Sequence, residues 1–241
     1  METSLPVALS GQIAMEKRLE TLAHNIANAR TVGFRAEEVR FEELLSRTGK
    51  DPVAFVTEGE TYLSNKSGAM TQTGNPLDLA VRGEAFFAFQ GDQGLVYTRD
   101  GRLQIAPDGS VQTLTGRAIV DAGGAALQLD PAGGPIVVDG RGMIQQNGQE
   151  VGAVGLFRIP ANANVTRHDN SGVVSDIPAA PVVDFLSDSV IQGYVEEANV
   201  NPLKEITRLI TLQRAFESAA NVVETNDRSL GEAIRSLGAN R

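Results

Sequence analysis

The chain of 241 residues contains no cysteine and no tryptophan, and aromatic residues make up only 5% of it. Without cysteine, disulfide bonds and zinc sites with thiolate ligands are excluded. No uninterrupted apolar run approaches the roughly 18 residues that a membrane-spanning helix needs, so we expect no membrane insertion. The N-terminal apolar stretch is also too short for a cleaved signal peptide. Because aromatic residues are scarce, any core must consist mainly of small aliphatic side chains.

Charge of one sign is concentrated in the middle of the chain. The net charge is −9, whereas the two ends, residues 1–30 and 203–241, are close to neutral. Binding to phosphate groups needs clustered lysine and arginine, so this balance argues against a nucleic-acid partner.

Residue types that carry chemistry are also sparse. The two histidines, His24 and His168, complete no zinc motif in a chain without cysteine. Three pairs of adjacent glutamates, 37–38, 42–43 and 196–197, would point apart on a helix or strand, and we expect them on solvated faces rather than in acid–base pairs. The sequence therefore predicts no catalytic, cofactor or metal site.

Apolar residues instead repeat at heptad spacing near both ends of the chain. Toward the C-terminus the spacing runs through Leu209, Leu212, Phe216, Val223, Asn226 and Leu230, and toward the N-terminus through Met15, Leu19, Leu22 and Ile26. Such spacing places side chains on one stripe of a helix, and the stripe needs a partner helix. We predict that the two terminal helices pair as a coiled coil and that these residues form an assembly interface.

The N-terminal helix is expected over about 4–29. Pro6 fits its first turn, and Gly33 can supply the left-handed backbone that ends it, just before Phe34. Asn25 and Asn28 lie late in the helix, where their amides can bond across a helical interface. We include both in the predicted assembly interface.

The C-terminal helix is expected to follow Asn199 and to continue to about Leu237. Asn201 is a suitable N-cap and Pro202 fits the first helical position. Asn226 occupies a seam position, where a polar residue can fix the register of paired helices.

Between the helices the pattern changes to short alternating segments. Glycine-containing turn dipeptides recur at 100–101, 108–109, 139–140 and 147–148, and they favour tight antiparallel hairpins, including one over 97–105. We therefore predict an α+β fold. A discontinuous helical domain (1–33 and 199–241) is joined through an extended linker region (34–75) to a central antiparallel β domain, a barrel or sandwich, over 76–198.

Several segments, in order along the chain, resemble the flagellar basal-body rod and hook family. They are Thr21–Arg35, Gly74–Phe87, Tyr97–Gly101, Gly193–Val200 and Arg214–Glu217, and together they span most of the chain. Two positions depart from the family pattern, with His24 and Ala198 where the family usually has asparagine and serine. The short start and the run 34–41 look most like the proximal-rod members, with distal-rod members as the alternative.

This resemblance implies a structural subunit of a hollow helical tube that transmits torque in the periplasm. It also implies export by the flagellar type III apparatus without a cleaved signal. The implied partners are other copies of the chain and neighbouring rod proteins. Two other classes compete with this interpretation: a cell-wall hydrolase, for which no convincing residue pair is found, and a soluble helical adaptor or export chaperone.

Overall fold

A computed structural model describes residues 4–46, 53–57 and 59–238. The chain forms two compact units. The helical unit comprises Met1–Ala27, Glu37–Tyr62 and Asn201–Arg241, and the β-rich unit comprises Asn28–Ala36 and Leu63–Val200. The chain therefore passes between the units near residues 27, 36, 62 and 200.

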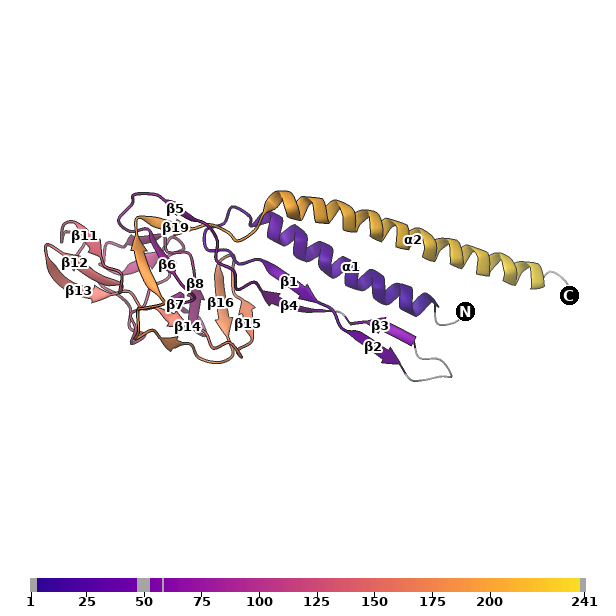
Figure 1. Cartoon of the computed structure of the whole chain (residues 1–241), viewed down its shortest axis with the longest axis horizontal. Coiled ribbons are helices and arrows are strands. Elements are labelled where there is room, and N and C mark those ends of the chain that lie inside the picture. Colours follow the sequence, from indigo (N-terminus) through magenta and orange to yellow (C-terminus); the bar gives the residue numbers. More distant parts are fainter. Residues whose placement is uncertain (1–3, 47–52, 58, 239–241) are drawn as a thin grey trace. The chain divides into compact units, whose positions relative to one another are not determined.

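Two long helices dominate the helical unit. Helices α1 (Ser4–Ala27) and α2 (Pro202–Gly238) lie side by side, and α2 is the longer (Figure 1). The start of α2 follows the prediction, because the Asn201 side chain accepts the Lys204 N–H at 3.2 Å. Helix α1 ends two residues before the predicted residue 29. The Thr31 N–H bonds the Asn28 carbonyl at 2.9 Å, which turns the chain at that point.

The described residues of 34–75, for which an extended linker or loop was expected, form five strands. Strand β1 (Glu37–Arg40) pairs with β4 (Glu60–Leu63), and β2 (Glu43–Ser46) pairs with β3 (Val53–Val56). Strand β5 (Met70–Gln72) pairs with β19 (Tyr194–Glu196). The partner of β5 lies more than 100 residues away along the chain, so local sequence patterns gave no indication of this pairing.

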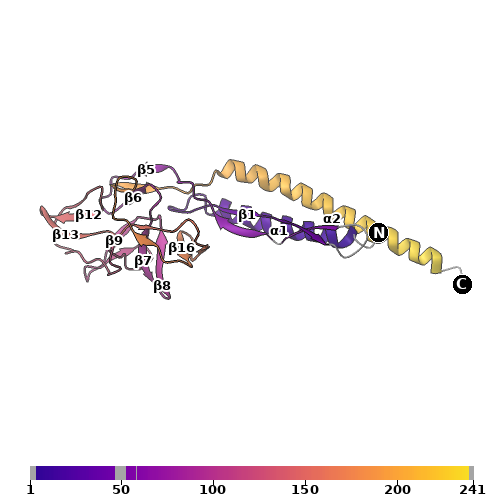
Figure 2. The same cartoon turned by 60° about the horizontal axis from the view of Figure 1, so that its bottom comes forward.

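The β-rich unit consists of several small sheets rather than one large one (Figure 2). The largest has the order β15-β16-β8-β7, and the next has the order β11-β12-β13. The bounds are β6 (Leu79–Arg82), β7 (Phe87–Gly91), β8 (Gly94–Thr98), β9 (Leu103–Ile105), β10 (Val111–Thr113), β11 (Ile136–Val138), β12 (Met143–Gln146), β13 (Gln149–Ala153), β14 (Phe157–Arg158), β15 (Val165–Arg167), β16 (Gly172–Ser175), β17 (Ala180–Pro181) and β18 (Ser189–Gln192). Pairing is antiparallel, as predicted, but the described strands do not close into a barrel.

The turn dipeptides give three of the four predicted hairpins. Those at 108–109, 139–140 and 147–148 connect β9–β10, β11–β12 and β12–β13. The hairpin predicted over 97–105 is wrong, because β8 and β9 belong to different sheets. The Gly101 carbonyl accepts the Leu79 N–H at 2.9 Å, and the Leu103 N–H bonds the Leu77 carbonyl at 3.0 Å, so the chain turns toward the segment 77–79.

The core of the β-rich unit is aliphatic, as the composition predicted. Its main cluster is built from small and branched side chains with only two phenylalanines, and includes Leu79, Val81, Phe87, Phe89, Val111, Ile119, Leu156 and Val190. A smaller cluster surrounds Tyr97 and Phe157. Strands β6 and β18 lie near the two ends of the segment 63–200 in sequence, and they contribute Val81 and Val190 to the same cluster. The two ends of this segment therefore pack together.

Candidate assembly surfaces and a buried junction

The predicted seam residues of α2 lie on the face of that helix that is least exposed. Leu209, Leu212, Phe216 and Val223 are half-buried, whereas most of their neighbours on α2 are exposed. The side chains of Asn226 and Leu230 lie outside the part of the chain that the structure describes. Half-burial at this spacing is consistent with a stripe that faces another helix.

Helix α1 is covered on two sides. Its predicted seam residues Met15, Leu19 and Ile26 are half-buried, and Leu22 is buried. A second stripe includes Ala14 and Asn25, both buried. Helix α1 contacts β1 and β3 as well as α2, which accounts for its two buried stripes.

Asn25 connects α1 to β1. Its side-chain amide donates to the Glu37 carbonyl at 2.8 Å, and its side-chain oxygen accepts the Glu37 N–H at 2.9 Å. The amide therefore bonds a strand of the same chain, and its partner is backbone. Asn28, also buried, accepts from the Thr31 hydroxyl at 3.2 Å.

A different set of apolar side chains on the helices remains exposed. On α2, Leu203 is 77% exposed, Ile206 41% and Ile210 47%. At 3.6 residues per turn these three lie on roughly the opposite side of α2 from the seam. On α1, Leu9 and Ile13 are exposed by 54% and 44%. We call the three α2 residues the outer stripe.

Three of the five predicted junction residues, Gly33, Phe34 and Asn199, lie close together within the β-rich unit. Gly33 has a φ of 71°, as predicted, and its N–H bonds the Glu196 carbonyl at 2.7 Å. The Phe34 carbonyl accepts the Asn199 N–H at 3.3 Å, and the Asn199 side-chain oxygen accepts the Ala36 N–H at 2.6 Å. Asn201 and Pro202 are exposed at the start of α2 and take no part in this set of bonds.

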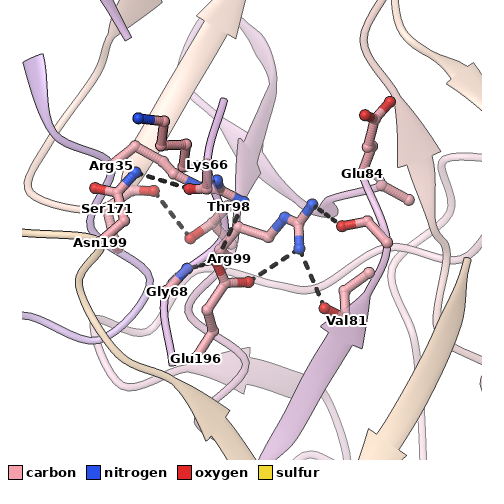
Figure 3. A network of polar contacts seen from close by, with 12 residues as sticks. Arg35, Lys66, Gly68, Val81, Glu84, Thr98, Arg99, Ser171, Glu196 and Asn199 are labelled. Atoms are coloured by element: carbon pink, nitrogen blue, oxygen red, sulfur yellow. Dashed lines mark hydrogen bonds and ion pairs between the residues drawn. The ribbon is translucent and has the colours of Figure 1, made fainter. Parts of the chain in front are cut away.

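The side chain of Glu196, whose carbonyl accepts the Gly33 N–H, is the centre of a buried ion-pair network (Figure 3). Glu196, only 1% exposed, contacts the guanidinium of Arg99 at 2.9 Å and that of Arg35 at 3.2 Å. Its carboxylate also accepts the Gly68 N–H at 2.9 Å. One carboxylate thus connects residues from three distant parts of the chain.

The two arginines are held by backbone carbonyls as well as by Glu196. Arg99, 1% exposed, donates to the Val81 carbonyl at 3.1 Å and to the Gly83 carbonyl at 2.7 Å. Arg35 donates to the Lys66 carbonyl. Burial lowers the pKa of Arg99 to about 10, against the opposing effect of Glu196, and it lowers the pKa of Arg35 in the same way. Both side chains remain charged at neutral pH.

This network was not predicted from the sequence. The prediction that Glu196 lies on a solvated face is wrong, because the adjacent Glu197 takes the more exposed position and Glu196 points into the unit. Arg35, Arg99 and Glu196 each lie in a segment that carried the family resemblance, but nothing in the spacing indicated that they meet. The structure shows no cluster of metal-ligating side chains within its described residues, and none of the described helices has the length and apolarity to cross a membrane.

Comparisons with known proteins cover all of these regions. Three family descriptions match: "Flagella basal body rod protein" over residues 5–35, "Flagellar hook protein FlgE/F/G D1 domain" over 80–176, and "Flagellar basal body rod FlgEFG protein C-terminal" over 191–236. The FlgF rod protein of Mesorhizobium japonicum is 46% identical over 239 residues, which covers 99% of both chains. The chain belongs to the family of flagellar basal-body rod proteins.

Other rod proteins place it more narrowly. The FlgF rod protein of Rhizobium meliloti is 44% identical over 241 residues and covers all of both chains. The FlgG rod protein of Bacillus subtilis is 29% identical over 265 residues, covering 97% of this chain and 98% of its own. This rod protein is therefore a structural subunit of the basal body, similar to the FlgF type that forms the proximal rod.

Proposed function

We propose that this subunit assembles with neighbouring rod subunits through its terminal helices. In this proposal α1 and α2 pair as a coiled coil along the predicted seam, and the assembled helices line a hollow tube. No catalytic role is assigned to the chain.

The observation that carries this proposal is the outer stripe of α2. Three large aliphatic side chains at 203, 206 and 210 remain 41–77% exposed although α2 already lies beside α1. Exposed apolar side chains that recur on one helix face indicate a surface that another molecule covers. Repeated contacts between different surfaces of successive copies generate open helical assemblies, which suits a tube.

The partners that follow are other copies of this chain and adjacent rod proteins. For these subunits to reach the rod, we propose export through the flagellar type III apparatus, in an unfolded state and N-terminus first.

The test is a substitution on the outer stripe in motile cells. Because Ile206 is already 41% exposed, Ile206→Asp should leave the purified chain folded and abolish swimming. The matched control is Val183→Asp, at a side chain that is 88% exposed in the β-rich unit, and this variant should swim. Normal swimming of the Ile206 variant would remove the outer stripe from the assembly surface.

A second measurement separates the proximal from the distal position. Quantitative mass spectrometry of purified basal bodies, with heavy-labelled peptides, should find this chain at a small fraction of the distal-rod signal. A signal equal to the dominant rod component would move the chain to the distal rod.

A further inference from the structure

Strands β18 and β19, near the C-terminal end of the β-rich unit, pair with strands that lie more than 100 residues earlier in the chain. Strand β18 pairs with β6 in register from Ser189 opposite Arg82 to Gln192 opposite Leu79. Strand β19 pairs with β5 from Tyr194 opposite Gln72 to Glu196 opposite Met70. Within the described residues, β5 and β6 have no other strand partner. Residues 188–200, which we call the closing segment, therefore supply the pairing strand for both β5 and β6.

Two buried carboxylates belong to the same segment. Asp188, with a fully buried side chain, accepts the N–H of Glu84 at 2.7 Å and of Ala85 at 3.0 Å, and it pairs with Arg158. Glu196 pairs with Arg35 and Arg99, as described above. Both carboxylates thus bond groups that come earlier in the chain, and both lie in the closing segment.

The buried arginines make the earlier part of the β-rich unit depend strongly on the closing segment for its stability. A conformation that buried Arg35 and Arg99 before Glu196 arrived would enclose two guanidinium charges without a counter-charge, which is far less favourable than leaving them in water. The backbone groups of Glu84 and Ala85 would likewise be buried without an acceptor. The N-terminal part of the unit is thus poorly stable until the closing segment docks.

We propose that the closing segment delays folding of the β-rich unit until residue 200 is available. For a chain exported N-terminus first, this keeps the unit open until almost all of it has left the channel. This second step relies on the export route proposed above, whereas the delay itself is a property of the chain alone.

The delay can be measured on the intact purified chain as it refolds from denaturant. Pulsed amide exchange with mass spectrometry would follow when each segment becomes protected. We expect residues 33–36 and 79–85 to gain protection in the same phase as 188–200. The hairpin of β7 and β8 closes a short loop without the closing segment, so it can form earlier. Protection of 33–36 and 79–85 before 188–200 would overturn the proposal.

Two substitutions test the carboxylates in the folded chain. Glu196→Gln keeps the shape of the side chain but removes the charge that balances two arginines, and Asp188→Asn does the same at the other end of the segment. Each should raise native-state exchange at least tenfold at 33–36, 79–85 and 188–200 together. The matched control is Asp92→Asn, which removes an exposed carboxylate paired with Arg117 at 2.6 Å, and should leave all three segments unchanged.

If Glu196→Gln does not fold, the Asp188 variant and the refolding of the unaltered chain still decide the question. Faster exchange confined to 188–200, with 33–36 and 79–85 unchanged, would overturn the closing role. The export step is tested separately in cells that lack the flagellar export apparatus. Secretion of the chain from those cells would refute the export route and leave the folding result intact.

Discussion

Gly33→Ala is the most informative single substitution at the junction, because two separate costs can be worked out from the structure. The first is conformational: at φ 71°, a residue with a side chain is strained by about 1–2 kcal/mol. The second is steric: an added Cβ would lie against the backbone nitrogen of Asp100 and 2.6 Å from the carbonyl carbon of Arg99. Neither atom belongs to a flexible side chain, so the backbone must move.

The movement would disturb the bond from the Gly33 N–H to the Glu196 carbonyl, which contributes about 1 kcal/mol, and would displace Arg99 from its buried position. We expect a total loss of about 3–5 kcal/mol, in the range of the larger single-site effects. The matched control is Gly74→Ala, where φ is 74° but no atom lies within 4 Å of the added Cβ, so only the conformational cost applies.

The assay is thermal unfolding of the β-rich unit, followed by near-ultraviolet circular dichroism of its tyrosines. The two variants share the conformational cost, so they differ by about 1–4 kcal/mol. At about 2–4 °C per kcal/mol, the melting temperature of the Gly33 variant should lie roughly 2–16 °C below that of the Gly74 variant. Equal melting temperatures for the two variants would refute the steric argument and with it the close approach of residues 33 and 100.

Three further perturbations have defined outcomes. Leu212→Asp places a charge on the half-buried seam, which costs several kcal/mol if the seam pairs with another helix. The variant should not swim, while the melting temperature of the β-rich unit should be unchanged. A swimming variant would show that the seam is no interface. Asn25→Ala removes both bonds to the Glu37 backbone and should speed amide exchange at β1 several-fold, and an unchanged rate would contradict this role. Burial acts to raise the pKa of Asp188, but the bonds from Arg158, Ala85 and Glu84 outweigh it, so the pKa is lowered. The stability that the ionised Asp188 contributes is therefore present at neutral pH and lost as the pH falls below about 4. In acid titrations of stability, the Asp188→Asn variant should lack this loss.

The helices could be predicted from sequence because their signals are local. Heptad spacing, the N-cap at Asn201 and the proline at Pro202 all act within a few residues, and α2 begins at Pro202 as those signals indicate. The hairpins with short turns are local in the same sense, and three of the four dipeptides mark real ones. The prediction over 97–105 fails because Gly101 does not take the positive φ of a tight hairpin turn, and the flanking strands β8 and β9 pair with other partners.

The network around Glu196 could not be predicted because its members are far apart in the chain. Between Arg35 and Glu196 lie 160 residues, and no periodicity extends across such a distance. The residue type also favours the wrong prediction here, because glutamates are mostly exposed and both Glu196 and Glu197 were therefore predicted to be solvated. Only a structure shows which of the two points inward, and here it is Glu196.

Hydrogen bonds near this network also hold parts of the chain that pass between the two units. Three of the chain passages between the units, near residues 36, 62 and 200, are joined in the β-rich unit, since Ala36 bonds both Ser64 (2.8 Å) and Asn199 (2.6 Å). Both bonds involve the backbone of Ala36, so a displacement of this one residue would break both of them. The bonds around Ala36 and the predicted seam of the helices have different sequence signals. The predicted seam follows from helical periodicity, whereas the junction depends on groups that meet only in the folded chain.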